Sequence, residues 1–227
     1  MESIRNLARV VVKPSRVFEW IKENPVWWVP IILLVITSVI FAVVSVPLSI
    51  EVSQKALSSN SNISPEQAAQ AKKMMESPLF SVIAAASAFI GTIIAFFVQS
   101  ALLHLGAYIF GGRAKFSVGL ATVGYAQIPI VIQQIIQSAY MVASGKIVVP
   151  GLSALLPSSR AATPLGVMLA RIDVFGIWSI ILLIIGFSFT YKITKTKAAA
   201  VTVGYWALGT IFAVLSVLLS MSFKPAG

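Results

Sequence analysis

The 227-residue sequence contains no cysteine, a single histidine and only seven acidic residues. The missing cysteines exclude disulfide bonds, thiolate metal ligands and thiol nucleophiles. A metal site needs several ligands placed together, and one histidine without neighbouring carboxylates does not supply them. Neither the HExxH pattern of zinc proteases nor the GxSxG pattern of serine hydrolases occurs. The sequence therefore predicts no metal site, no catalytic residues, no cofactor and no enzymatic activity.

Charged residues are scarce as well, at 11% of the chain against about 25% in an average soluble domain. Hydrophobic residues make up 58%, and the mean hydropathy is +0.92. They gather in five continuous runs without acids, each near or above the ~20 residues that a helix needs to cross ~30 Å of hydrocarbon. These runs cover roughly residues 27–50, 79–109, 118–143, 174–191 and 198–223.

Continuous apolar runs predict helices, because a membrane-spanning strand would alternate apolar and polar residues. The predicted fold class is all-α: a polytopic membrane helical bundle of five transmembrane helices, with short N-terminal amphipathic helices. We expect a cytoplasmic amphipathic segment over residues 1–25 and one five-span membrane domain over residues 26–227.

Lysine and arginine exceed the acids by 17 to 7, which gives a formal net charge of +10. In so apolar a chain this excess indicates anionic lipid headgroups as the partner, and not nucleic acid. Five cations precede the first run, and the short second and fourth connections carry two and three. The longer remaining segments carry three, three and one. This bias places the N-terminus in the cytoplasm and, with five spans, the C-terminus outside.

Two short amphipathic helices are expected before the first run, separated at Pro14. Apolar side chains recur at the spacing of one helical face in the first of them, at Ile4, Leu7, Ala8 and Val11. The helices either lie in the headgroup plane or dock on the cytoplasmic face of the protein itself. Basic residues are the candidates for binding lipid headgroups: Arg5, Arg9, Lys13 and Arg16.

Polar side chains inside the second and third runs need partners, because hydrocarbon offers none. The candidate intramembrane polar site comprises Gln99, Ser100, His104, Tyr108, Gln127, Gln133, Gln134 and Gln137. One interpretation is a polar pathway in which His104 responds to protons. The other is a set of interhelical hydrogen bonds that fix the packing of the helices.

Three further features concern helix geometry. Pro129 lacks a backbone donor and predicts a kink that frees a carbonyl near Tyr125, as architecture or as part of a moving element. Asp173 at the entry to the fourth run, with Trp178 after it, is either a helix cap that Arg171 is close enough to share or a functional acid. Small residues form a ridge along the second run that would allow close helix packing: Ala84, Ala88, Gly91 and Ala95.

The polar connections carry helix-start signals. Ser64, followed by Pro65 and by Gln67 three residues on, forms a capping-box pattern for a short helix that ends near Glu76. Thr163-Pro164 can start another short helix ahead of the fourth run. The segment 147–156 is apolar but too short to cross, so it is expected to be interfacial or re-entrant.

Several motifs, taken in order, resemble the Yip1 family of membrane proteins. Residues 124–129 read Gly-Tyr-Ala-Gln-Ile-Pro, similar to the family's Gly-Tyr-small-x-x-Pro pattern, so Gly124, Tyr125 and Pro129 are the candidate motif residues. The resemblance extends to residues 111–112 and 116 before this motif and to residues 172–178, 197–198 and 204–205 after it. Near the N-terminus, residues 14–18, 24–25 and 27 are like the prokaryotic branch of the family.

The resemblance implies five spans with a cytoplasmic N-terminus, in the plasma membrane of a prokaryote. Eukaryotic relatives act in vesicle traffic and bind Rab-type GTPases through a longer acidic N-terminal region with an Asp-Leu-Tyr-Gly-Pro motif. That motif is absent here and the region is basic. GTPase binding is therefore not carried over to this chain.

Two functions follow as hypotheses. The first is a non-enzymatic membrane protein that organises the bilayer or partner proteins, with other membrane proteins or further copies of itself as partners. The alternative is a transporter or channel for a small solute that uses a polar path between the second and third runs.

Overall fold

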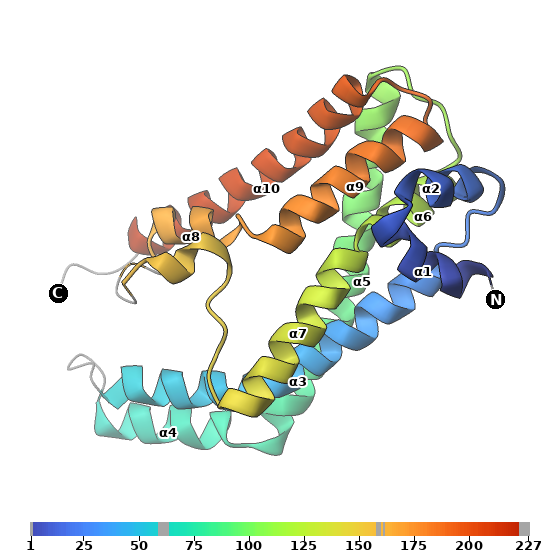
Figure 1. The fold of residues 1–227 in the computed structure, drawn as a ribbon. Helices are drawn as coiled ribbons and strands as arrows, with labels where there is room; N and C mark the ends of the chain where they lie inside the picture. Colours follow the sequence, from blue (N-terminus) through green and yellow to red (C-terminus); the bar gives the residue numbers. More distant parts are fainter. Residues whose placement is uncertain (1, 59–63, 158–159, 161, 223–227) are drawn as a thin grey trace. The chain divides into compact units, whose positions relative to one another are not determined.

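The computed structural model describes residues 2–58, 64–157, 160 and 162–222. Every element in this part of the chain is a helix, which confirms the all-α class. In order, the elements are α1 Glu2–Val12, α2 Pro14–Glu23, α3 Trp28–Ser58, α4 Pro65–Met75, α5 Pro78–Ile109, α6 Phe116–Ala126, α7 Ile128–Ser144, the 3-10 helix η1 Gly151–Leu155, α8 Pro164–Ala170, α9 Val174–Thr190 and α10 Lys195–Ser222 (Figure 1).

Four stretches are long and apolar enough to cross a membrane: Trp28–Gln54, Pro78–Ile109, Phe116–Ser144 and Lys195–Ser222. A fifth span arises when α8 and α9 are taken together, although these helices meet at a bend of 60°. The chain is therefore a polytopic α-helical membrane protein of four or five spans. The last residue of the fifth predicted run, residue 223, lies outside the described residues.

Helix bounds differ from the apolar runs where polar residues continue a helix. α3 ends at Ser58 and not near residue 50, and Pro47 lies within it. α10 begins at Lys195, before the apolar run at residue 198. Hydropathy measures the length of hydrocarbon that a helix can cross, whereas backbone hydrogen bonding continues into water wherever the residues tolerate helical geometry.

The chain divides into two compact units. Unit 1 comprises residues 1–31, 96–130 and 149–227 and holds α1, α2, α6, η1, α8, α9, α10 and the adjoining ends of α3, α5 and α7. Unit 2 comprises residues 32–95 and 131–148, with most of α3, α4, the first part of α5 and most of α7.

Unit 1 is built around α9, which packs against α2, α6 and α10. α9 and α10 run side by side along much of their length (Figure 1). From α2, the Phe18 and Ile21 side chains are fully buried, as is Phe187 of α9. Full burial of such a side chain contributes about 1.5–3 kcal/mol. For α2, the docked interpretation is therefore correct: its apolar face is covered by protein.

Within unit 2, polar side chains of α3 and α7 form hydrogen bonds. Thr37 Oγ1 donates to Gln134 Oε1 at 2.6 Å, and Gln134 Nε2 donates to Ser38 Oγ at 3.0 Å. The predicted capping box of α4 is confirmed, because Ser64 Oγ accepts from Gln67 N and Gln67 Oε1 accepts from Ser64 N. Such a pair satisfies two amides that a helix end leaves unpaired.

Candidate functional site

The third span is broken at Gln127, between α6 and α7. Pro129 provides no backbone N–H, and Ile130 N turns to the Gln127 carbonyl at 2.9 Å. The Ala126 carbonyl is thereby left for the α9 side chain Ser179, whose Oγ donates to it at 2.7 Å. The predicted kink is confirmed as a helix break, and the carbonyl with a new partner lies one residue beyond the predicted Tyr125.

The other two motif residues fix close contacts on α6. A Cβ on Gly124 would lie 2.7 Å from Pro30 Cγ, so the absence of a side chain allows the first turn of α3 to approach. Tyr125 is fully buried and its hydroxyl donates to the Ser3 carbonyl at 3.1 Å. Its ring also meets Trp20 edge-on at 6.3 Å. The motif therefore connects α6 to α1, α2 and α3.

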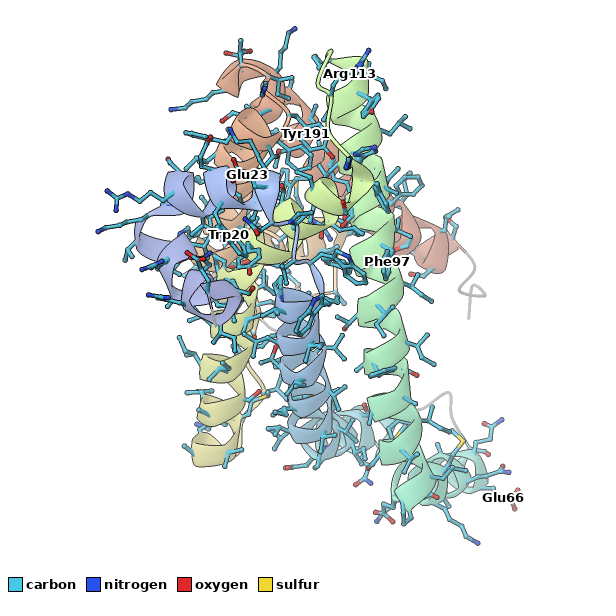
Figure 2. All side chains as sticks on the ribbon, turned by 90° about the vertical axis from the view of Figure 1, so that its right-hand side faces the viewer. Trp20, Glu23, Glu66, Phe97, Arg113 and Tyr191 are labelled. Atoms are coloured by element: carbon cyan, nitrogen blue, oxygen red, sulfur yellow. The ribbon has the colours of Figure 1, made fainter. Side chains whose placement is uncertain are left out.

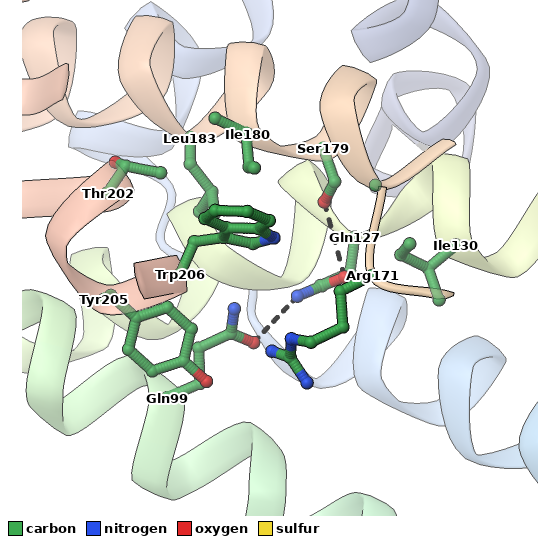
Figure 3. Close-up of a pocket in the computed structure, with 11 residues that line it drawn as sticks. Gln99, Gln127, Ile130, Arg171, Ser179, Ile180, Leu183, Thr202, Tyr205 and Trp206 are labelled. Carbon is green, nitrogen blue, oxygen red and sulfur yellow. Dashed lines mark hydrogen bonds between the residues drawn. The ribbon is translucent and has the colours of Figure 1, made fainter. Parts of the chain in front are cut away.

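Gln127 is the central residue of a short hydrogen-bond chain in unit 1. Its Nε2 donates to Gln99 Oε1 at 2.7 Å, and its Oε1 accepts from Ser179 Oγ at 3.4 Å. These side chains border a cavity of about 290 Å³ between α5, the α6–α7 break, α9 and α10 (Figure 3). The cavity is lined by Gln99, Gln127, Ile130, Arg171, Gly176, Ser179, Ile180, Leu183, Thr202, Tyr205 and Trp206.

Arg171 is a member of this site that the sequence analysis did not include. Its place in the sequence, two residues before Asp173, predicts a position in a connection outside the membrane. In the structure it ends α8, its Nε donates to Thr210 Oγ1 of α10 at 3.1 Å, and it lines the cavity. The sequence does contain a signal for it, because Arg171 is a cation between two apolar stretches. An ionisable residue within a membrane span is a candidate functional residue.

Asp173 caps α9, as the simpler of the two sequence interpretations held. Its Oδ1 accepts from Phe175 N and Gly176 N, both at 2.9 Å. A carboxylate at this position also interacts favourably with the positive end of the helix dipole. Trp178 follows in the second turn of α9 and is half-buried. The predicted start of α8 is confirmed too, because Thr163 Oγ1 accepts from Gly166 N.

His104 belongs to an aromatic cluster at the other end of α9. His104 Nδ1 is hydrogen-bonded to the hydroxyl of Tyr191, which follows α9. The imidazole also meets the Tyr108 ring at 4.9 Å and the Phe116 ring at 5.2 Å. Arg113 covers Tyr108 at 4.8 Å, a cation–π arrangement. The histidine therefore has an aromatic and phenolic environment, in which Tyr108 is its one neighbour from the predicted polar site among these contacts.

The predicted polar residues form separate groups and not one row. Gln99 and Gln127 pair in unit 1, His104 and Tyr108 lie in the aromatic cluster, and Gln134 bonds to α3 in unit 2. Ser100 Oγ is buried without a hydrogen-bond partner among the described residues. Gln133 and Gln137 are half-buried on α7. These local contacts fit the interpretation that the polar residues fix packing.

The ridge of small residues on α5 is more open than the sequence suggested. Ala84 and Ala88 are half-buried, while Gly91 and Ala95 are exposed. A Cβ on Gly91 would have no neighbour within 4 Å. No close helix contact is therefore made at Gly91 by the described residues.

Basic residues gather at the end of unit 1 where α2, the α5–α6 turn and the α9–α10 turn meet. They surround a cleft of about 460 Å³ that also contains Glu19 and Glu23. Figure 2 shows Glu23, Arg113 and Tyr191 at this end. Glu19 pairs with Lys22. The cations of the cleft are Lys22, Arg113, Lys115 and Lys192.

α1 extends this basic end. Asn6 and Val10 are its buried residues, while Ile4 and Val12 are 66% and 72% exposed. On the face predicted to be apolar, Ile4 and Ala8 are exposed while Leu7 and Val11 are half-buried. The exposed cations are Arg5, Arg9, Lys13 and Arg16. Three of them line a second cleft of about 250 Å³ between α1 and α2, together with Glu2: Arg9, Lys13 and Arg16.

Comparison with protein families finds one described as Yip1 domain, which matches residues 8–217. This match covers most of the 227 residues. No match was found among curated proteins or among solved structures. In the described part of the chain, no group of three or more His, Cys, Asp or Glu residues could hold a metal ion.

Proposed function

The chain belongs to the Yip1 family of membrane proteins, and we propose that it organises anionic lipids and partner membrane proteins at its basic end without catalysing a reaction. Members of this family are non-enzymatic. The observation that carries the proposal is α1, a helix with exposed apolar side chains beside exposed cations. This combination is typical of helices that lie in the headgroup region of a bilayer.

The basic cleft supports the same function. Lys22, Arg113, Lys115 and Lys192 converge on it from three separate segments of unit 1. Each cation near an anionic surface contributes about 1 kcal/mol of attraction, and basic pockets between helices accept phosphate headgroups. Anionic lipids would therefore collect around this end of the protein.

The proposal places the N-terminus in the cytoplasm of a prokaryotic cell and the protein in the plasma membrane. Support comes from the cleft, because α2 and both short turns bring their cations to one end of unit 1. Cations favour the cytoplasmic side.

The chain has no native cysteine, so a cysteine in place of Lys195 can be labelled alone. Labelling from the cytoplasmic side only is expected, and labelling from outside only would contradict this orientation.

The position of α1 provides the test of the proposed function. In lipid nanodiscs, a cysteine in place of Val12 would carry a fluorophore whose emission shifts to the blue in an apolar environment. We expect a blue shift when the nanodisc contains phosphatidylglycerol and a smaller one with phosphatidylcholine alone. A cysteine in place of Glu66, exposed on α4 and outside the basic end, is the matched control and should report water in both lipids. Emission typical of water at position 12 in both lipids would contradict the proposal.

A further inference from the structure

The cavity beside Gln99 and Gln127 contains a cation without an ion-pair partner among the described residues. Arg171 belongs to neither of the ion pairs Lys22–Glu19 and Lys72–Glu76. Among the described residues, Arg171 hydrogen-bonds only through Nε, which donates to Thr210 Oγ1 at 3.1 Å. Both Nη atoms of its guanidinium therefore remain available as donors, in the forked geometry that matches phosphate and carboxylate oxygens.

The Arg171 side chain is exposed and contacts α10 well inside the length of that helix. Thr210, its partner on α10, lies 15 residues after Lys195 and 12 before Ser222. At 1.5 Å per residue these intervals are about 22 Å and 18 Å. A charge at such a depth is costly unless it pairs with a group of opposite charge or with water. An anion in the cavity would remove that cost.

The cavity walls provide further donors. Gln99 uses its oxygen to accept from Gln127, which leaves its amide nitrogen available. Tyr205 and Trp206 also line the cavity, with a hydroxyl and an indole N–H as their polar groups (Figure 3). Donors that surround a cation favour an anionic ligand with several oxygens. A volume of about 290 Å³ suits the polar head and not a whole lipid.

The surroundings of the cavity are apolar. Ile130, Ile180 and Leu183 form part of its wall. On α10, just past Trp206, the side chains of Leu208, Ile211 and Phe212 are largely exposed. On α5, Val98 and Leu102, which flank Gln99 in the sequence, are exposed as well. A membrane-spanning helix turns such side chains to lipid. A ligand reaching the cavity from that side must carry an apolar tail.

A rigid break holds Arg171 in place between α8 and α9. Gly151 of η1 has a φ of +55°, and a Cβ there would lie 2.7–2.8 Å from the carbonyl oxygens of Leu169, Ala170 and Ile172. Leu152 N donates to the Ile172 carbonyl at 3.0 Å. Only glycine combines this backbone conformation with so close an approach. The guanidinium is thus presented by ordered backbone on both sides of Arg171.

We propose that this cavity binds the phosphate group of an anionic membrane lipid, with Arg171 as the principal ligand and Gln99, Tyr205 and Trp206 as further donors. The site is separate from the basic cleft and does not depend on the proposed function. The same phosphate chemistry could come from free inorganic phosphate, and the experiment distinguishes the two sources.

Fluorescence quenching of Trp206 tests the site directly. The chain has five tryptophans, so the other four are replaced by phenylalanine. This variant is placed in phosphatidylcholine nanodiscs with increasing amounts of phosphatidic acid whose acyl chains carry bromine. We expect quenching that saturates with phosphatidic acid. Brominated phosphatidylcholine should quench weakly, and equal quenching by both lipids would overturn the assignment.

Substitutions then identify the ligand. Arg171→Gln is expected to raise the half-quenching concentration at least about tenfold, with Arg171→Lys in between because lysine lacks the fork. Arg160→Gln, which removes an exposed cation outside the cavity, should leave it unchanged. Equal quenching in the variant that keeps only Trp206 and in the same variant with Arg171→Gln would overturn the proposal. Relief of quenching by inorganic phosphate would overturn the lipid as the source.

Circular dichroism checks that the substituted chains keep their helices. If Arg171→Gln does not fold, Gln99→Leu tests the same cavity without removing a charge. We expect it to raise the half-quenching concentration several-fold, because a donor is lost. An unchanged concentration in Gln99→Leu would then overturn the proposed donor set.

Discussion

At the scale of single residues, Gly124, Tyr125 and Pro129 of the motif each have a different structural role. Gly124 allows the turn at Pro30 to approach α6, and Tyr125 ties α6 to the carbonyl of Ser3. Pro129 opens the helix so that Gln127 can reach α5 and α9. A short motif can therefore determine how several helices meet.

Replacing Gly124 by alanine should destabilise unit 1. Its new Cβ would lie 2.7 Å from Pro30 Cγ, and a proline ring cannot turn aside as a long side chain can. Overpacking of this kind costs about 1–3 kcal/mol. Thermal unfolding in detergent should show a lower midpoint. Gly91→Ala is the control, because its Cβ meets nothing within 4 Å and the midpoint should stay or rise slightly. Equal effects at both positions would contradict this account.

Tyr125→Phe should remove one hydrogen bond and keep the packing of the ring. The lost bond to the Ser3 carbonyl corresponds to about 1 kcal/mol of unfolding free energy. A lower unfolding midpoint is therefore expected. Tyr140→Phe, at a half-exposed side chain on α7, is the matched control and should not change the midpoint. A midpoint for Tyr125→Phe that matches the native chain would show that the bond does not contribute.

At the scale of elements, two helix breaks shape unit 1. The break between α6 and α7 leaves the Ala126 carbonyl to Ser179, and the 60° bend between α8 and α9 places Arg171 beside α10. Each break is stabilised by a side chain or loop from elsewhere in the unit, so that few backbone groups stay unpaired.

A double-mutant cycle tests the α6–α7 break. Ser179→Ala alone should cost about 1–3 kcal/mol, because the buried Ala126 carbonyl loses its partner. With Pro129→Ala present, Ile130 N can return to that carbonyl and the helix can close. Ser179→Ala should then cost much less, which appears as a coupling energy in thermal unfolding. Additive effects of the two substitutions would argue against the proposed role of Pro129.

At the scale of the whole molecule, the sequence predicted much of the fold because its signals are local. Apolar length indicated the spans, and hydroxyl residues ahead of proline indicated the starts of α4 and α8. The partners of polar side chains were not predictable in this way. Gln134 could have met Gln127 or His104, and only tertiary packing brought it to Thr37. Arg171 was missed because hydropathy assigned its segment to a loop.

The separation of the polar groups gives a prediction for pairs of substitutions. Gln99→Leu and Gln127→Leu should be strongly coupled in thermal unfolding, because each removes the partner of the other. Gln99→Leu and Gln134→Leu should be additive, since these residues make separate hydrogen bonds in different units. Strong coupling of Gln99 with Gln134 would favour the continuous polar path of the transporter hypothesis.

The central claim is that the basic end of the protein gathers anionic lipid. Quantitative mass spectrometry of the lipids that remain with the protein, purified from its host membrane, measures this most directly. The account predicts an enrichment of anionic lipids over the bulk membrane. It also predicts that most of this enrichment disappears when Lys22, Arg113, Lys115 and Lys192 are replaced by glutamine while Arg171 is kept. Lipids in the same proportions as the bulk membrane, or an enrichment that the four substitutions leave undiminished, would contradict it.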